Sequence, residues 1–252
     1  MSKINLGTCR KIIFLIIAAI SLLSMASCTN NGSSVVDSSA PSDSAADINS
    51  AGISASLQDG TTSEAVNSYT AALKDILNSP QKTAVAVNGE PIYDSDIKAA
   101  ALFQEYELSK NINILKGDAS FNEEEYLKQY KKSEADITDE LIKQRVLAEA
   151  AQAAGIEVAM SDAESEAKTA WEIVIKNEPY YAQKLFDAYG TDSAGYIKTV
   201  AAPAQQQFML AQKYEEYFAE KSSNKNDREK LKAEYLSHID DLIKKADIKY
   251  YD

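Results

Sequence analysis

Cysteine and histidine are almost absent from this sequence. Its 252 residues contain two cysteines, Cys9 and Cys28, and a single histidine, His238. Because Cys9 falls within a stretch that is typical of a removable export signal, Cys28 is the only cysteine expected in the mature chain. An internal disulfide, a thiolate metal site and a cysteine nucleophile are therefore excluded for the exported domain. His238 lies between Tyr235 and Ile239 in a helical pattern, which favours a position at a helix surface or boundary over a catalytic one.

Glycine is also scarce, and nine glycines leave little material for phosphate-binding loops. The sequence has no HExxH, GxSxG or calcium-loop motif either. The consecutive acids Glu123–Glu125 and Asp240–Asp241 point to different sides of a helix, so a solvated surface explains them better than a metal or acid–base site. We therefore expect no cofactor, no bound metal and no catalytic residue, and we do not expect an enzyme.

Positive charge is in deficit. The formal net charge is −12, and removal of residues 1–27, which carry three basic and no acidic side chains, changes it to −15. Nucleic-acid binding needs clustered lysine and arginine, so nucleic acid is not an expected partner.

The N-terminus has the pattern of a secretory signal at residues 1–27. A basic start precedes the apolar run Ile12–Leu23, whose twelve residues are too few to span a bilayer. Met25 and the small residues Ala26 and Ser27 stand directly before Cys28 and resemble the lipobox at which bacterial lipoproteins are lipidated and cleaved, although leucine is commoner than Met25 in such motifs. We expect Cys28 to carry a lipid that anchors the chain to the extracytoplasmic face of the cell membrane; the alternative is an ordinary signal with an incidental cysteine.

A flexible acidic tether is predicted at residues 28–63, because Thr29–Ser63 is rich in serine, alanine, aspartate, asparagine and glycine and has no lysine or arginine. The folded domain is predicted to occupy residues 64–252.

Two strand-like pieces stand at the two ends of this domain. Val85 and Val87 alternate with alanines, and the turn dipeptide Asn88-Gly89 joins them to a short return arm, Glu90–Ile92. Asp247–Tyr251 is the only other strand-like piece, and a lone hairpin is marginal in water. We therefore predict that the two ends of the domain meet in a small two- or three-stranded sheet.

The residues between these ends predict helices. Asp94 and Ser95 are expected to cap the first of them, and Ser161–Glu164 a later one. Gly117, Gly155 and Gly190 are expected to end helices, and Pro203 to kink or break the longest one. The predicted helices are Glu64–Asn78, Asp96–Lys116, Phe121–Ser133, Asp136–Ala154, the helix from Ser161 to Lys176, Pro179–Tyr189, Ser193–Lys221 and Asp227–Ala246. The predicted fold class is mostly α.

Three of these stretches together resemble the SurA/PrsA family of exported foldases. They are VAVNGEPI followed by a helix, then LIKQRVLAEAAQAAGIEVAMSDAE, and finally LIKKADIKYYD. Their order covers about Thr83–Asp252. The resemblance implies a SurA N-terminal-like chaperone domain, which binds unfolded, aromatic-rich segments in an apolar cleft between helices.

The sequence departs from that family at one point. Family members usually carry a parvulin-type prolyl isomerase domain before the last helix, whereas here Ser222–Asp227 leaves no room for one. The resemblance therefore implies a chaperone for unfolded or nascent exported proteins that has no isomerase activity. The alternative is an adaptor or structural lipoprotein that docks one specific envelope partner.

Tyrosine is abundant, with fourteen residues against six phenylalanines. Most of these rings are expected at half-buried edges of the core, and some are expected to line a peptide groove, where an apolar ring with a polar tip suits varied sequences. The candidate peptide-binding residues are Tyr106, Tyr130, Trp171, Tyr196, Phe208 and Tyr214.

Overall fold

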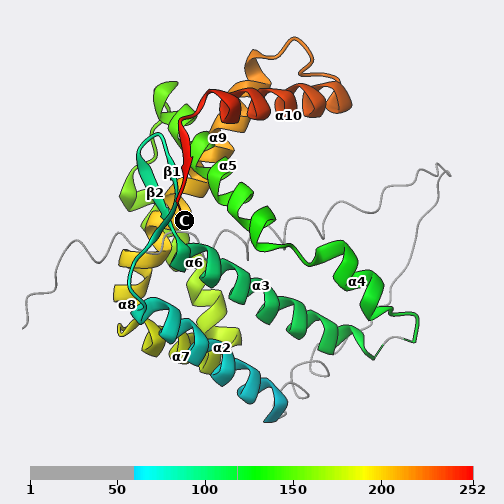
Figure 1. The fold of residues 1–252 in the computed structure, drawn as a ribbon, viewed down its shortest axis with the longest axis vertical. Coiled ribbons are helices and arrows are strands. Elements are labelled where there is room, and N and C mark those ends of the chain that lie inside the picture. The colour runs from blue at the N-terminus through cyan, green and yellow to red at the C-terminus, as the bar shows by residue number, and fades with distance from the viewer. Residues whose placement is uncertain (1–59, 118, 252) are drawn as a thin grey trace, which may run out of the picture.

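The computed structural model describes residues 60–117 and 119–251 (Figure 1). The predicted signal, Cys28 and most of the predicted tether thus lie outside the described residues. The first described helix begins at Gly60, four residues before the predicted start of the domain.

A three-stranded antiparallel sheet joins the two ends of the domain. Strand β1 (Thr83–Val87) pairs with β2 (Glu90–Tyr93) on one side and with β3 (Ile248–Tyr250) on the other, in the order β2-β1-β3. Asn88 and Gly89 form the hairpin turn with φ angles of 52° and 88°, as their dipeptide predicts. The predicted meeting of the two ends is confirmed.

Helix α2 precedes β1 and the other described helices fill the chain between β2 and β3, so the predicted mostly α fold class is confirmed. They are α2 (Gly60–Asn78), α3 (Asp94–Leu115), α4 (Glu123–Tyr130), α5 (Glu134–Ala153), α6 (Met160–Asn177), α7 (Pro179–Tyr189), α8 (Ser193–Tyr196), the π-helical segment η1 (Ile197–Ala201), α9 (Ala202–Lys221) and α10 (Arg228–Lys245).

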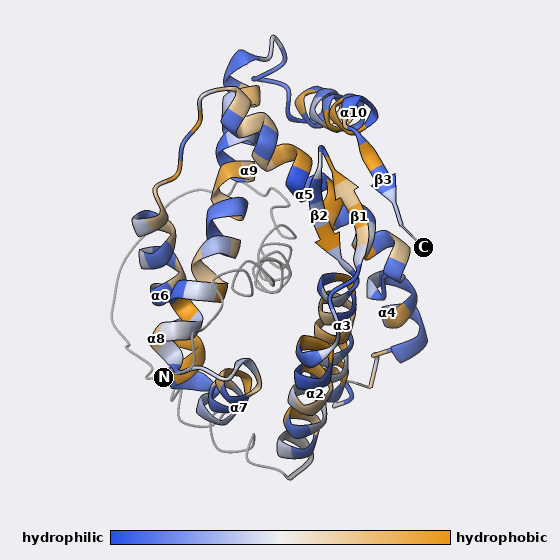
Figure 2. Ribbon diagram, turned by 60° about the vertical axis from the view of Figure 1, so that its left-hand side comes forward, coloured by the Kyte–Doolittle hydropathy of each residue, from blue (hydrophilic) through white to orange (hydrophobic). Residues whose placement is uncertain are grey.

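Six of the helices form a closed circuit of contacts. Helix α2 packs against α3, α3 against α5, α5 against α9, α9 against α6, α6 against α7, and α7 back against α2. Figure 2 shows the two sides of this circuit, with α2 and α3 on one side and α6, α8 and α9 on the other. The sheet and α10 lie together at one end, where α5 contacts both β1 and α10.

The core falls into three clusters that follow this circuit. One cluster lies between α2, α3, α6, α7 and α9 and includes Leu73 and Tyr196. A second cluster lies under the sheet and joins Val85, Val87 and Ile92 to α3 and α5. The third joins α5, α9 and α10. Partly buried side chains of α10 belong to both the second and the third cluster, so α10 links the sheet to the helices.

Two predicted helix caps are wrong. Helix α3 already begins at Asp94, so Tyr93 is its N-cap residue, and Asp96 instead accepts a hydrogen bond from the Tyr93 N–H at 2.9 Å. Helix α6 begins at Met160 and places Ser161 inside its first turn. Tertiary contact sets this second boundary, because Val158 is buried and its carbonyl accepts a hydrogen bond from the Gln206 side chain.

The predicted helix stops are confirmed in two of three cases. Gly155 and Gly190 adopt left-handed φ angles of 76° and 65°, which glycine adopts without strain. Gly117 follows the end of α3 at Leu115 but does not adopt a positive φ angle, and there the Lys116 N–H closes the last turn by donating to the Ile112 carbonyl.

The break predicted at Pro203 takes the form of the π-helical segment η1. Proline has no N–H to donate to a carbonyl one turn earlier, and its ring needs extra room there. The preceding chain widens, so that the Ala202 N–H donates to the carbonyl of Ile197, five residues back.

Candidate functional site

The structure places three of the six candidate aromatic residues in the core: Trp171 and Tyr196 in the first cluster, and Tyr214 in the third. Tyr196 is 1% exposed, and its ring meets that of Trp171 edge-on, with 4.8 Å between the ring centroids. Phe186 and Tyr189 of α7 complete this aromatic cluster. Trp171 and Tyr196 therefore hold α6, α7 and α8 together, and neither presents a free ring face to a peptide.

Tyr106 belongs to a stack of three tyrosines. Its ring lies 4.7 Å from that of Tyr69 on α2 and 5.4 Å from that of Tyr181 on α7, with interplanar angles of 24° and 5°. Burial raises the pKa of all three phenols. The stack lies beside the ion pair between Lys110 and Glu178, whose N···O distance is 2.7 Å, and it joins α2, α3 and α7.

Tyr214 and the other two candidates lie elsewhere. Phe208 is half-buried against the first core cluster. The Tyr214 hydroxyl lies 2.9 Å from His238 Nε2 at the contact of α9 and α10, where His238 is half-buried. Tyr130 is exposed on α4, beside the ring of Tyr126. The six residues therefore do not converge on one groove. The sequence prediction grouped them because helical spacing alone does not distinguish an inward-facing ring from one that faces solvent.

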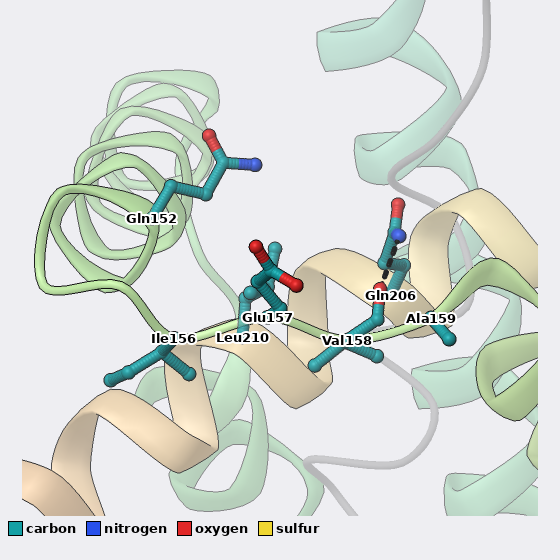
Figure 3. A pocket seen from close by; sticks show the side chains of 7 residues that line it. All are labelled: Gln152, Ile156, Glu157, Val158, Ala159, Gln206 and Leu210. Carbon is teal, nitrogen blue, oxygen red and sulfur yellow. Dashed lines mark hydrogen bonds between the residues drawn. The ribbon is translucent and has the colours of Figure 1, made fainter.

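An open pocket lies instead beside the extended link between α5 and α6 (Figure 3). We call it the link pocket. It holds about 380 Å³ and is lined by Gln152, Ile156, Glu157, Val158, Ala159, Gln206 and Leu210. Val158 and Leu210 are 7% and 2% exposed, so they form an apolar floor, while Gln152 and Glu157 are exposed at its rim.

Helix α9 fixes the backbone of this link. The Gln206 amide nitrogen donates to the Val158 carbonyl at 2.7 Å, and the Lys213 ammonium donates to the Glu157 carbonyl at 3.5 Å. Gly155 ends α5 in a left-handed conformation and turns the chain into the link. The sequence predicts the end of α5 at Gly155, whereas the partners of the link on α9 lie about fifty residues further along and carry no local signal.

A second pocket of about 390 Å³ lies between the end of α2, the outer face of α3 and the segment that joins α4 to α5. Its apolar lining comes from Ile76, Ala101 and Leu102. Lysines surround it, but each is paired with a carboxylate, as Lys132 is with Glu140. This pairing leaves the second pocket without a net positive field that would select an anion.

One buried carboxyl stands out among the titratable groups. Asp96 is 5% exposed, and desolvation raises its pKa from 3.8 to about 7, although the Tyr93 N–H and the charge of Arg145 act in the opposite direction. Across residues 60–117 and 119–251, the His, Cys, Asp and Glu side chains form no cluster that could hold a metal ion. The helices of this part of the chain include none that is long and apolar enough to cross a membrane.

Comparison of the chain with protein-family models, with curated proteins and with solved structures finds no match. The resemblance to the SurA/PrsA family therefore stays a prediction.

Proposed function

We propose that this protein is a lipid-anchored, extracytoplasmic chaperone that holds unfolded exported polypeptides without isomerase activity. The link pocket is the observation that carries the proposal. Its floor of Val158 and Leu210 accepts an apolar side chain, and its rim offers amide and carboxylate groups to the main chain of a bound segment. Such a lining recognises features common to many unfolded sequences and supplies no reactive group.

The acidic surface sets a preference among clients. At a formal charge of −15 for residues 28–252, long-range repulsion disfavours acidic clients and favours neutral or basic ones. The preference weakens as the salt concentration rises, because exposed charges more than about 8–10 Å apart are screened at physiological ionic strength.

Filling the link pocket tests this function. Ala159 is exposed and lines the pocket, so Ala159→Trp should place an indole in it without disturbing the core. The wild-type chain should suppress the aggregation of three unrelated unfolded proteins, measured by light scattering, and Ala159→Trp should lose most of this effect. Ala71→Trp is the matched control, since Ala71 is exposed on α2 and does not line the pocket.

Two results would contradict the proposal. One is equal suppression by the wild type and Ala159→Trp. The other is no protection of any client together with one tight, stoichiometric folded partner recovered from membranes, which would favour an adaptor.

The membrane anchor is tested separately at Cys28, the only cysteine that follows residues 1–27. Labelled palmitate should enter the wild-type chain in bacteria, and Cys28→Ala should lose both the label and membrane attachment. Equal labelling of the variant would show that the lipid is not on Cys28.

A further inference from the structure

The outer edge of β3 carries main-chain hydrogen-bonding groups that point away from the sheet. The Asn88 N–H donates to the Asp247 carbonyl at 2.8 Å, and the Tyr251 N–H donates to the Ala84 carbonyl at 2.9 Å. In an antiparallel pair, alternate residues direct both polar groups to the same neighbour. Asp247, Lys249 and Tyr251 therefore face β1, while the N–H and C=O groups of Ile248 and Tyr250 face outward.

The opposite edge of the sheet is blocked. Val85 and Val87 stand opposite Ile92 and Glu90 across the two-residue turn, so these pairs hold the β1–β2 hydrogen bonds, and Pro91 faces outward. Proline has no N–H, and its ring occupies the place of an incoming strand. Among the described residues, strand addition is thus prevented at β2 and remains open at β3, which Figure 2 shows on the outer side of the sheet.

A second copy of this chain fits the open edge poorly. The antiparallel register that uses both outward residues pairs Ile248 of one copy with Tyr250 of the other and sets the two Lys249 side chains directly opposite each other. Like charges in that position destabilise a strand pair. Lysine at an exposed edge is also a common protection against self-association.

We propose that β3 binds an extended segment of an unfolded polypeptide as a fourth strand of the sheet, and that the segment carries an apolar–acidic–apolar pattern. Tyr250 stands opposite Val85, so it shares the core-facing side of the sheet with Ile248, yet its own side chain is 68% exposed. Apolar side chains of the segment lie beside Ile248 and Tyr250. The acidic residue between them lies opposite Lys249. The Lys249 ammonium forms an exposed ion pair with Asp247 at 2.7 Å, and because such surface pairs contribute little, it can exchange Asp247 for the carboxylate of the segment.

The choice of an unfolded exported chain as the source of this segment rests on the proposed function. The edge itself recognises main chain, which every extended polypeptide presents, and Lys249 adds only a severalfold preference for an acidic residue. This local preference opposes the repulsion from the acidic surface as a whole, so the bound segment is expected to be acidic at one position in an otherwise neutral or basic client.

Binding can be measured with a fluorescein-labelled ten-residue peptide that alternates valine and threonine around one central glutamate. Each amide of the peptide is methylated in turn, and the full chain is titrated by fluorescence anisotropy. Methylation at alternate amides should weaken binding about tenfold for each lost hydrogen bond, while methylation at the intervening amides should have little effect.

Three variants of the protein complete the test. Tyr250→Pro should abolish binding, because it removes an outward N–H and its ring occupies the place of the incoming strand, as Pro91 does on the other edge. The bonds from Lys249 and Tyr251 to β1 stay in place. Tyr250→Val is the matched control that keeps the outward N–H. Lys249→Glu should reverse the preference between peptides with a central glutamate and a central lysine. Unchanged melting temperatures would show that the variants are folded.

A methylation scan without period two, or Tyr250→Pro binding as tightly as the wild type, would overturn the proposal. A wild-type dimer that Tyr250→Pro converts to a monomer would overturn it too, by making a second copy the occupant. A scan without periodicity while Ala159→Trp abolishes aggregation suppression would remove only the β3 site. A periodic scan without suppression of any client would remove the chaperone function and leave β3 as a peptide-binding edge.

Discussion

Asp96 shows how one buried side chain makes the stability of this protein depend on pH. Its Oδ2 accepts a hydrogen bond from the Tyr93 N–H, whereas Oδ1 is buried and has no hydrogen-bond partner within the described part of the chain. Burial raises the pKa of this carboxyl from 3.8 to about 7. Near neutral pH the folded protein therefore binds a proton at Asp96 that the unfolded chain has released.

Asp96→Asn should remove that pH dependence. A pKa that is higher in the folded state gives stability that is fully present below pH 3.8 and is lost as the pH rises through about 7. In this window the wild-type free energy of unfolding should lose up to about 1.4 kcal/mol per pH unit relative to the variant. Asparagine can still accept from the Tyr93 N–H, so the variant should be the more stable protein above pH 7.

Urea unfolding of both proteins at intervals from pH 4 to pH 8 measures this difference. Asp94→Asn is the control, because Asp94 is only partly buried and its side chain is paired with Lys98 on the surface. Parallel stability curves for the wild type and Asp96→Asn would contradict the assignment of a raised pKa to Asp96.

At the residue scale, the sequence predicts local backbone turns better than it predicts which side chains are buried. The Asn88-Gly89 turn follows from its own two residues, and its φ angles agree with the prediction. Asp96 looks in the sequence like any acid in the first turn of a helix, and Trp171 and Tyr196 look like groove residues. Contacts with α6, α7 and α8 bury these rings, and the helical period contains no information about those contacts.

At the scale of elements, α2 is part of the folded body. Leu73 is fully buried, and the Tyr69 ring stacks against Tyr106 of α3 and Tyr181 of α7. The Tyr180 hydroxyl of α7 also donates to the Asn67 side chain at 2.7 Å. Helix α2 therefore closes the circuit between α3 and α7. Its apolar spacing predicts a helix with one buried face, but it does not predict which helices that face contacts.

Leu73→Ala should lower the free energy of unfolding by about 2–5 kcal/mol, because it leaves a cavity between α2 and its neighbours. Leu236→Ala on α10 is the matched control: Leu236 is 47% exposed, so the same change should cost about 0.5 kcal/mol or less. Chemical denaturation measures both. Equal stability of the two variants would show that α2 is an appendage.

Helix boundaries show where local signals compete with tertiary ones. Ser133 caps α5 as its own sequence allows, with the Asp136 N–H donating to its hydroxyl. Ser161 has an equally good capping pattern but lies within α6, because Val158 and Gln206 fix the link before it. A capping motif therefore predicts that a helix begins nearby, and a distant contact decides at which residue.

At the scale of the whole molecule, the sequence predicts the sheet but not the circuit of helices. Only two stretches outside the predicted helices alternate like strands, and a short hairpin needs a third strand to be stable. The pairing of β1 with β3 therefore had few alternatives. Each helix, by contrast, offers an apolar face that could pack on several others. The contacts of α5 and α6 with α9 therefore come from the structure, and with them the floor of the link pocket.

Because the circuit is closed, the last seven residues should stabilise regions far from the sheet. Deletion of residues 246–252 removes β3, uncovers Val87 and leaves the polar groups of Ala86 without strand partners. The loss should reach at least about 2 kcal/mol, from one partly buried isoleucine and several main-chain hydrogen bonds. Hydrogen exchange should quicken in α6 and α7 as well as in β1, since the domain is expected to unfold as one cooperative unit.

Replacing Lys249 and Tyr250 with threonine and valine is the control that keeps the strand and should leave exchange in α6 and α7 unchanged. If the truncated protein exchanges faster only in β1 and α10, the sheet end and the α6–α7 side are separate units, and closure of the circuit does not couple them.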